Sequence, residues 1–402
     1  MKIFRIVIPL ILVTAILLTG CQGQVDQPPA PTSIPLPTAQ PGSSGEGTEP
    51  SNPPPRVIPP ENSIQLPEGF GITVYADGLE GPRMMAFGPD DMIYVAEPNT
   101  GRILRLPDRD GDGIADGIEI AADELLDPTS LVFYKDGSMY VAETTRVIRL
   151  EDPDGDGFYQ EREVIVAGIA ASGYTYRTII FSPDWQHLYL SIGSSCNVCR
   201  EQDQRRATVM RFNPDGSGGR IYTKGLYYVV GMAFNPRNDI LWVTNVERTG
   251  LGIDLPPETL YVIYIDADAG WPFCHAGRIT DPEYGNKNSC EEVLNPYFEL
   301  EAHTIPFGIT FYTGEQFPEH YQNDLFIALH GSSEGSQPVG HKIIRIPFGP
   351  GENGPVQDFA VGWLLEDGSN WGTPVDLIVG PDGSLFLSDD SRGIIYRIYY
   401  SG

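Results

Sequence analysis

The segment PTSLVFYKDGSMYVAETTRVIRL, residues 128–150, contains the pattern from which the fold can be predicted. Runs of alternating apolar and polar residues flank the pair Asp136-Gly137, which is typical of a turn between antiparallel strands. Five other segments repeat this order of features: an apolar strand, an Asp-Gly-like turn, and a second strand rich in Tyr, Val, Leu and Ile. They are residues 82–106, 177–212, 229–263, 306–348 and 374–400.

Six copies of one unit predict an all-β, six-bladed β-propeller over residues 61–402. Each copy offers three strands and the connecting stretch a fourth, which makes a four-stranded blade. The strand at 71–76, GITVYA, has no unit of its own, so we expect it to complete the last blade and close the ring, because blade edges are otherwise exposed. The alternative, a two-sheet sandwich, would not repeat one turn phrase six times. Insertions at 264–305 and 331–341 are expected to shape a site on one face.

The first 60 residues predict export and a lipid anchor. A short positive region precedes an apolar run at 6–18, and Leu18-Thr19-Gly20-Cys21 resembles a bacterial lipobox. Residues 1–21 are therefore predicted to be a lipoprotein signal peptide with Cys21 as the lipidated residue; a plain signal peptide is the alternative. Residues 22–60, rich in Pro, Ser and Thr, predict a disordered tether. We expect an exported, membrane-anchored lipoprotein at the cell surface or on the periplasmic side.

The charge of the chain limits its partners. With 54 acidic and 26 basic side chains the formal net charge is -28. Nucleic acid and anionic membrane surfaces would be repelled by such a body. Neutral or cationic small molecules and divalent cations are the expected partners.

The cysteines predict two disulfides. Apart from Cys21 there are four, an even number, which suits an oxidising compartment. Proximity pairs Cys196 with Cys199 and Cys274 with Cys290. The Cys-x-x-Cys segment could instead be a redox pair, although it follows a strand, or a haem attachment, although Arg200 occupies the position of the required His. Zinc bound by the four cysteines with His275 is a further alternative.

Two loops match the calcium-loop pattern of acids at positions 1, 3 and 5, Gly at 6 and Glu at 12: residues 108–119, DRDGDGIADGIE, and residues 152–163, DPDGDGFYQERE. Carboxylates at alternate positions of a tight loop converge on one cation. Strands flank both loops, so structural calcium sites are predicted, with solvated Asp-Gly turns as the alternative. The expected ligands are Asp108, Asp110, Asp112, Asp116 and Glu119 in the first loop and Asp152, Asp154, Asp156 and Glu163 in the second.

Several longer phrases point to a known family. They are GPRMMAFGPDD at 81–91, LYLSIGSSCNVCREQDQRRATVMRFNPDG at 188–216, VERTGLGIDLPPETL at 246–260, GWPFC at 270–274, LFIALHGS at 325–332 and WGTPVDLIVGPDGSLFLSDDSRGIIYRI at 371–398. Through them the chain resembles the soluble glucose and sorbosone dehydrogenases from about residue 66 to residue 400. These are six-bladed propellers that use pyrroloquinoline quinone (PQQ) and calcium, and the sorbosone dehydrogenase branch is the most similar.

The resemblance implies oxidation of a sugar hydroxyl or aldehyde by base-assisted hydride transfer to PQQ. The family's base is a His just before the first strand of the third blade, followed closely by an Arg. In this chain Tyr174 occupies the base position and Arg177 is retained, so these two are the catalytic candidates. An unperturbed phenol, with a pKa of about 10, is a poor general base at neutral pH.

Other candidate cofactor-binding residues come from the same comparison. Tyr227 and Tyr228 occupy positions where the family usually has Arg-Asn, and Thr373 stands where Arg is common, although Arg is the natural partner of the quinone's three carboxylates. The loop at 246–254 is similar to the family segment whose carbonyls hold the cofactor calcium. Its Glu247, Arg248 and Asp254, together with His330, complete the predicted site.

Two functions follow from these observations. The first is a PQQ- and calcium-dependent dehydrogenase of a small sugar or aldehyde, for which the sequence names no electron acceptor. The alternative is a non-catalytic propeller that binds a carbohydrate or other ligand at the same face, where Tyr174, Tyr227 and Tyr228 would supply an aromatic lining.

Overall fold

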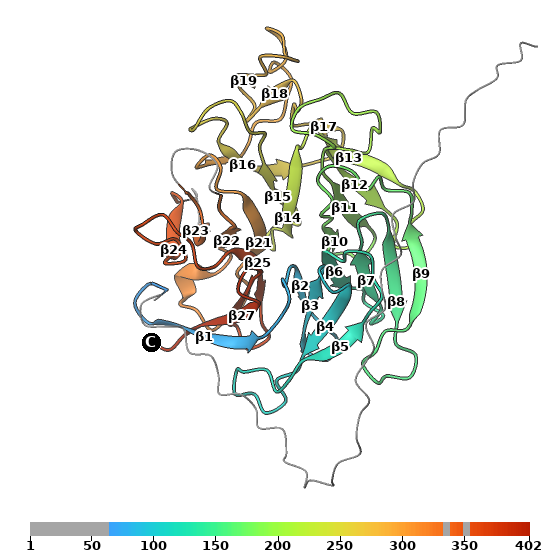
Figure 1. Ribbon diagram of the computed structural model, residues 1–402, viewed down its shortest axis with the longest axis vertical. Helices are drawn as coiled ribbons and strands as arrows, with labels where there is room; N and C mark the ends of the chain where they lie inside the picture. The colour runs from blue at the N-terminus through green and yellow to red at the C-terminus, as the bar shows by residue number, and fades with distance from the viewer. Residues whose placement is uncertain (1–63, 333–337, 349–353) are drawn as a thin grey trace, which may run out of the picture. The chain divides into compact units, whose positions relative to one another are not determined.

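The computed structural model describes residues 64–332, 338–348 and 354–402; the predicted signal peptide, Cys21 and the tether lie outside the described residues. Six sheets, each built on four antiparallel strands, surround a central axis (Figure 1). The predicted all-β, six-bladed propeller is confirmed. Among the described residues the helical element is one 3-10 turn, η2 (Glu319–Tyr321), and no helix there is long and apolar enough to cross a membrane.

Each blade begins at the axis and runs outward strand by strand. The first three blades are β2 (Met85–Phe87), β3 (Ile93–Glu97), β4 (Arg102–Leu106) and β5 (Glu119–Ala122); β6 (Ser130–Phe133), β7 (Met139–Ala142), β8 (Val147–Glu151) and β9 (Glu161–Val166); and β10 (Ile179–Phe181), β11 (Leu188–Ile192), β12 (Thr208–Phe212) and β13 (Arg220–Lys224). The next two are β14 (Tyr228–Phe234), β15 (Leu241–Val246), β16 (Glu258–Ile263) and β20 (Phe298–Leu300); and β21 (Pro306–Phe311), β22 (Leu325–Leu329), β23 (Lys342–Ile346) and β24 (Gln357–Ala360). The sixth is β25 (Pro374–Val379), β26 (Leu385–Asp389), β27 (Ile394–Tyr400) and β1 (Phe70–Asp77).

The sixth blade closes the ring with the two ends of the described chain. Strand β1 is antiparallel to β27, with Phe70 opposite Tyr400 and Ile72 opposite Ile398. The Phe70 ring also packs edge-on against Phe317, 4.7 Å between centroids. The expectation that GITVYA completes the last blade is therefore confirmed, and no blade edge is left open at the seam.

The repeated turn phrase has one physical cause. In the second blade the Ser138 N–H donates to Oδ1 of Asp136 at 3.0 Å, while Gly137 adopts φ +88°, a conformation that side chains disfavour. The sixth blade repeats the arrangement with Asp382 and Ser384. An Asp, a Gly and a Ser in this order thus reverse the chain between the first two strands of a blade.

The core lies between blades, because every sheet is covered on both faces by its neighbours. The second strands β3, β7 and β26 are buried throughout, and aromatic side chains fill the wedge between adjacent blades. Between the first and second blades the Tyr94 ring packs edge-on against Phe133, 4.9 Å between centroids. Such aromatic pairs stabilise sheet packing beyond the area that they bury.

The insertion at 264–305 departs from the repeat. Its first part forms β17 (Ala267–Asp268), which adds in parallel to β13 and gives the third blade a fifth strand. A small hairpin of β18 (Cys274–His275) and β19 (Ile279–Thr280) follows, and the fourth strand of the fourth blade, β20, comes only after it.

Candidate functional site

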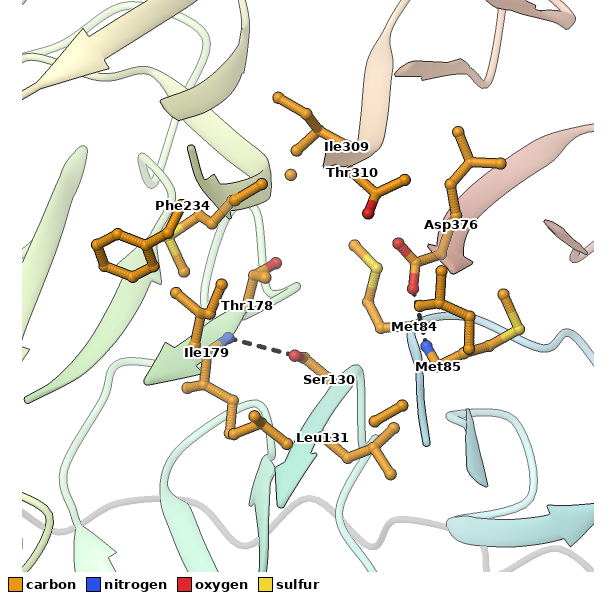
Figure 2. A pocket seen from close by; sticks show the side chains of 18 of the residues that line it. Met84, Met85, Ser130, Leu131, Thr178, Ile179, Phe234, Ile309, Thr310 and Asp376 are labelled. Carbon is orange, nitrogen blue, oxygen red and sulfur yellow. Dashed lines mark hydrogen bonds between the residues drawn. The ribbon is translucent and has the colours of Figure 1, made fainter. Parts of the chain in front are cut away.

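The innermost strands line an axial cavity of about 490 Å³ between all six blades (Figure 2). Asp376 is the one ionisable side chain among the described residues of its lining. Oδ2 of Asp376 accepts a hydrogen bond from the Met85 N–H at 2.8 Å, and burial raises the pKa of this carboxyl to about 7. The remaining walls are largely apolar.

A second cavity, here called the face pocket, has a volume of about 630 Å³. Its residues stand near the beginnings of innermost strands and the ends of second strands, and Glu258 begins the third strand β16. These strand ends meet at the same edge of an antiparallel sheet. The pocket therefore occupies one face of the propeller. Its ionisable or aromatic lining consists of Arg83, Tyr174, Tyr176, Tyr227, Tyr228, Glu247, Glu258, His303, Phe307, His330 and Asp390.

The three predicted tyrosines meet in the face pocket. The Tyr174 ring centroid lies 4.7 Å from that of Tyr228 and 5.0 Å from that of Tyr227, and the Tyr227 hydroxyl donates to the Tyr174 hydroxyl. Burial raises the pKa of Tyr227 and of Tyr228 far above that of a free phenol. Both therefore stay protonated at neutral pH and offer the pocket a ring and a neutral hydroxyl.

Arg177 lies behind the face pocket and is not among its lining residues. The side chain is fully buried, and its Nη1 donates to the carbonyl oxygens of Tyr174 and Tyr176 at 2.6 and 3.2 Å. Burial, with a smaller effect of nearby Arg206, lowers the pKa of Arg177 to about 10. Its role in this geometry is to position the backbone that carries Tyr174.

Glu247 and Glu258 form the acidic wall of the face pocket. The Glu247 N–H donates to Oε2 of Glu258 at 2.6 Å, and both side chains are buried. Oε1 of Glu247 accepts from Asn245 and from Thr259, each at 3.0 Å. Burial raises the pKa of Glu258 to about 8, with the negative charge of Glu247 adding to the effect. Glu258 is therefore largely a neutral acid at pH 7.

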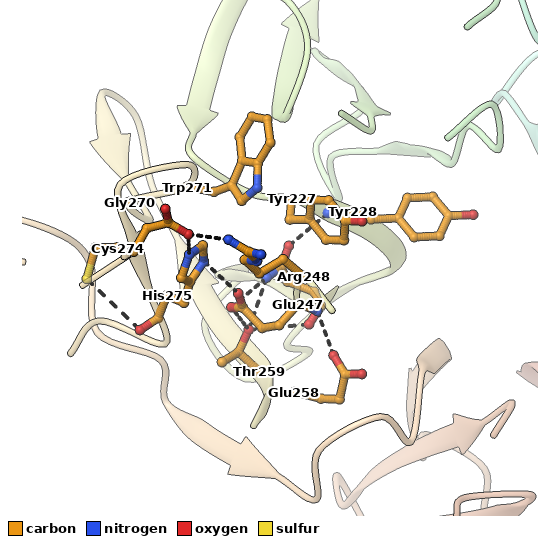
Figure 3. Close-up of polar contacts among 12 residues, drawn as sticks. Tyr227, Tyr228, Glu247, Arg248, Glu258, Thr259, Gly270, Trp271, Cys274 and His275 are labelled. Atoms are coloured by element: carbon orange, nitrogen blue, oxygen red, sulfur yellow. Dashed lines mark hydrogen bonds and ion pairs between the residues drawn. The ribbon is translucent and has the colours of Figure 1, made fainter. Parts of the chain in front are cut away.

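Behind this wall lies a buried ionic group (Figure 3). The guanidinium of Arg248 pairs with Asp281. His275 lies between Asp281 and Glu247: Nε2 is 3.0 Å from Asp281, and Nδ1 is 3.7 Å from Glu247, too far for a hydrogen bond. Burial tends to raise the pKa of Asp281, but hydrogen bonds from its backbone neighbours, His275 and Arg248 outweigh it and lower the pKa to about 2. Arg248 is thus neutralised and does not line the pocket.

A second ionic group stands on the opposite side. Asp390 binds the guanidinium of Arg83 and the hydroxyl of Thr373, and its Oδ2 lies 3.3 Å from Nε2 of His330. Burial alone would raise the pKa of Asp390, but His330 and Arg83 overcome it and lower the pKa to about 2. The Arg83 guanidinium also stacks on Tyr176, 4.0 Å from the ring centroid. His330 therefore lies in the pocket as predicted, already engaged by Asp390.

The remaining predicted residues lie elsewhere. Asp254 is exposed on the loop after β15 and does not reach the pocket lining. Both predicted disulfides are confirmed, Cys196–Cys199 and Cys274–Cys290. The first is close to the pocket, because Asn197 between its cysteines accepts from Thr249 N–H at 2.9 Å.

In both predicted calcium loops the first three acids converge. Ligand oxygens of Asp108, Asp110 and Asp112 lie within 4.8 Å of one another, as do those of Asp152, Asp154 and Asp156. The glutamates at position 12 are turned to arginines instead: Glu119 pairs with Arg105 and Arg109, and Glu163 approaches Arg149 at 3.8 Å. Asp116 accepts from the Arg109 N–H at 2.7 Å. These loops lie outside the face-pocket lining.

Sequence reasoning missed Arg83, Glu258 and Asp390 as site residues. Arg83 and Asp390 are 307 positions apart and meet only because the ring closes. Glu258 follows two prolines in LPPETL and looked like an ordinary strand residue. A usable signal was available for all three, since each lies within a phrase that carried the family resemblance.

Comparison with known proteins finds sequence relatives that match most of this chain. The chain is 27% identical over 347 residues to an uncharacterized protein of Borreliella burgdorferi, covering 84% of this chain and 91% of that protein. It is 23% identical over 411 residues to a PQQ-dependent pyranose dehydrogenase of Coprinopsis cinerea and spans 55% of that protein's length. It is also 23% identical to a PQQ-dependent sugar dehydrogenase of Hypocrea jecorina, covering 83% of this chain and 89% of that one.

Solved structures share the fold. A carbohydrate-active enzyme of family AA12 from Trichoderma reesei superimposes with a TM-score of 0.72 at 20% identity, covering 85% of this chain and 98% of that one. The holo PQQ domain of the Coprinopsis cinerea pyranose dehydrogenase gives 0.72 at 19% identity with the same coverages. The sequence and structural relatives thus include PQQ-dependent sugar dehydrogenases, as the resemblance implied. A family model described as a domain of unknown function, DUF7133, matches residues 61–397, and the chain belongs to that family.

Proposed function

We propose that the protein is a sugar dehydrogenase-like propeller that binds a small sugar, or an aldehyde derived from one, in the face pocket. The observation that carries the proposal is the meeting of flat rings and hydroxyl-accepting groups in one cavity of about 630 Å³. A sugar has an apolar ring face, which packs on aromatic rings such as Tyr174 and Tyr228, and a rim of hydroxyls, which bind polar groups such as Glu258.

Calorimetric titration of the full chain with a panel of mono- and disaccharides tests this proposal. We expect saturable binding of at least one sugar, weakened about tenfold or more by Tyr174→Ala, since one ring contact contributes on the order of 1 kcal/mol beyond its buried area. Tyr264→Ala is the matched control, because Tyr264 is exposed and lies outside the pocket lining. A folded protein that binds no sugar of the panel would reject the proposal.

Sugar oxidation with PQQ is the second candidate, favoured by the named sequence relatives. PQQ carries three carboxylates, so its site needs free cations. Arg83 is the one Arg or Lys among the described lining residues, and Asp390 already binds it. Lys342, which lies outside the pocket lining, pairs with Asp358 at 2.7 Å. The face pocket therefore does not fit PQQ, and no oxidation step is derived from it.

Titration of PQQ into the same protein, with calcium and then with chelator, separates the two candidates. Calcium-dependent binding in the micromolar range or tighter would favour the dehydrogenase and justify assays with sugars and aldehydes. If a folded sample that binds sugar gives no heat with PQQ, the function that remains is carbohydrate binding without PQQ.

The calcium loops are proposed as structural sites. Three carboxylates in each loop are close enough for one ion, and Oδ2 of Asp108 and Oδ2 of Asp152 accept from the N–H groups of Gly113 and Gly157 at 2.9 and 2.8 Å, which holds each loop in its turn. Oxygen ligands of this kind suit a hard divalent cation. The bound ions would join neighbouring strands within each of the first two blades.

The location is proposed from the sequence alone. An apolar leader ending at Cys21 supports export and a lipid anchor, which would place the pocket outside the cytoplasm. Mass spectrometry of the mature N-terminus tests this: a diacylated Cys21 is expected, and an unmodified Met1 would reject it.

A further inference from the structure

We infer that the face pocket selects its ligand by charge: it takes an amine-bearing sugar best, a neutral sugar next, and excludes carboxylated ligands, among them PQQ. The inference rests on the proposed sugar-binding function and names the ligand class. It follows from the way in which the charged groups around the pocket are paired with one another.

The basic side chains of the pocket already have polar partners. The Arg83 guanidinium binds Asp390 and lies between the Tyr176 and Phe307 rings, 4.0 and 5.2 Å from their centroids. His330 faces the same Asp390 at 3.3 Å, and Nε2 of His303 lies 3.0 Å from the Gly252 carbonyl oxygen. An arriving carboxylate would meet a guanidinium whose charge Asp390 already balances.

The opposite wall is acidic: it presents the carboxylate of Glu247 and the largely protonated carboxyl of Glu258. Arg248 and Asp281 neutralise each other, with His275 between Asp281 and Glu247. That leaves the pair Glu247 and Glu258, both in the lining and both buried. The backbone N–H of Glu247 holds the Glu258 carboxyl in place at 2.6 Å, and Asn245 and Thr259 hold the Glu247 carboxylate, each at 3.0 Å.

Ligand charge therefore changes affinity in one direction. An ammonium group near this wall gains a charge-assisted hydrogen bond and can take the place of the proton that Glu258 holds at pH 7. A neutral hydroxyl donates to the same oxygens without the charge. A carboxylate meets the negative charge of Glu247 in a buried site, which weakens its binding relative to that of a neutral sugar.

Three sugars of one ring size form a matched probe set: glucosamine, glucose and glucuronate. Their dissociation constants are measured by calorimetry on the full chain in mild detergent, at pH 7 and low salt, with PQQ as a fourth ligand. We expect about tenfold tighter binding of glucosamine than of glucose and at least tenfold weaker binding of glucuronate, one decade corresponding to 1.4 kcal/mol.

The outcomes separate the two proposals. Glucose and glucuronate binding equally, or PQQ binding more tightly than glucose, would overturn the charge inference and leave sugar binding standing. No binding of any of the three sugars would overturn the proposed function and this inference with it. The order glucosamine, glucose, glucuronate supports both.

Variants of the two acidic residues show where in the pocket ligand charge acts. Glu247→Gln and Glu258→Gln preserve shape while removing an ionisable carboxyl group, and each should reduce the glucosamine-to-glucose affinity ratio toward one. Asp215→Asn is the control, since Asp215 lies on an exposed turn bonded to Ser217 and outside the pocket. An unchanged ratio in both folded glutamine variants would contradict the inference, and the ranking in the unmodified protein tests it if neither variant folds.

Discussion

The side chains of Arg177 and Arg206 both donate to the carbonyl oxygen of Ala170, at 3.1 and 2.7 Å. Arg206 also reaches the Gly193 carbonyl oxygen at 3.2 Å. Two buried guanidiniums thus hold the segment before β10, the one that ends in Tyr174 and Tyr176, against the neighbouring strand. The pocket's aromatic lining depends on this buried support.

Arg177→Lys should therefore weaken both the fold and ligand binding. A lysine has a single ammonium and cannot reach the three carbonyls that Arg177 bonds, so buried acceptors lose partners at about 1–3 kcal/mol. Urea unfolding and sugar affinity measure the two effects. Arg211→Lys, whose side chain lies outside the pocket, is the control. Unchanged affinity in a folded Arg177→Lys protein would show that Arg177 does not position Tyr174.

The hydroxyl pair of Tyr174 and Tyr227 gives a second prediction. Because the Tyr227 hydroxyl has one proton, it donates either to Tyr174 or to Oδ1 of Asn197, 3.3 Å away. Tyr174→Phe should cost about 1 kcal/mol or less, since the donor can turn to Asn197, whereas Tyr227→Phe should cost more. The two changes should be non-additive in a double-mutant cycle of unfolding free energies, and strict additivity would show that the hydroxyls do not interact.

The fold could be predicted from the sequence because it is set by local patterns repeated six times. Strand alternation and the Asp-Gly-Ser turn, as at Asp136 and Asp382, depend on near neighbours only. The closing strand β1 was found by elimination, since it belonged to no unit. Strand β17 was missed, because a two-residue parallel pairing with β13 leaves no periodicity.

The site was only partly predictable, and distance along the chain explains why. The family resemblance indicated Tyr174, Tyr228 and His330, which the structure brings to one pocket. It gave no sign that Asp390 would hold Arg83 or that Asp281 would hold Arg248, since these pairs form through ring closure and through an insertion. Arg177 illustrates the limit: the residue was identified, but its orientation into the core depends on tertiary packing.

Calcium should stabilise the first two blades. A chelator should lower the melting temperature, and restoring calcium at about 100 times its dissociation constant should return about 2.7 kcal/mol for each loop. Asp110→Asn and Asp154→Asn should each reduce the calcium-dependent shift, whereas Asp215→Asn, in a turn without an acidic cluster, should not. A melting temperature that changes with neither chelator nor calcium would mean that these loops are solvated Asp-Gly turns.

The Cys274–Cys290 disulfide should stabilise the pocket from a distance. It closes a 16-residue separation that contains His275 and Asp281, the partners behind Glu247 and Arg248. Replacing both cysteines by serine should cost up to about 3 kcal/mol in the chain-entropy model and weaken sugar binding. The same change at Cys196 and Cys199, only three positions apart, should cost less stability. Thermal melts of both variants measure the two losses of stability, and equal losses would contradict the argument from loop length.

Two raised carboxyl pKa values predict how stability depends on pH. Glu258 has a pKa of about 8 against an ordinary 4.5, and Asp376 about 7 against 3.8. A pKa raised in the folded state stabilises the fold below the unfolded value, and this contribution is lost as pH rises through the folded value. The free energy of unfolding should therefore fall between about pH 5 and pH 8, by roughly 3 kcal/mol from Glu258 alone.

Glu258→Gln and Asp376→Asn should each flatten this pH dependence, because an amide does not titrate. They should differ in ligand binding, since Glu258 lines the face pocket and Asp376 lines the axial cavity. Urea unfolding at pH 5 and pH 8, paired with titrations of glucosamine and glucose, separates the two effects. Suppose that Asp376→Asn changed the ratio of glucosamine to glucose affinity as much as Glu258→Gln. The charge in the axial cavity would then affect binding in the face pocket, and the face pocket would not be a separate site.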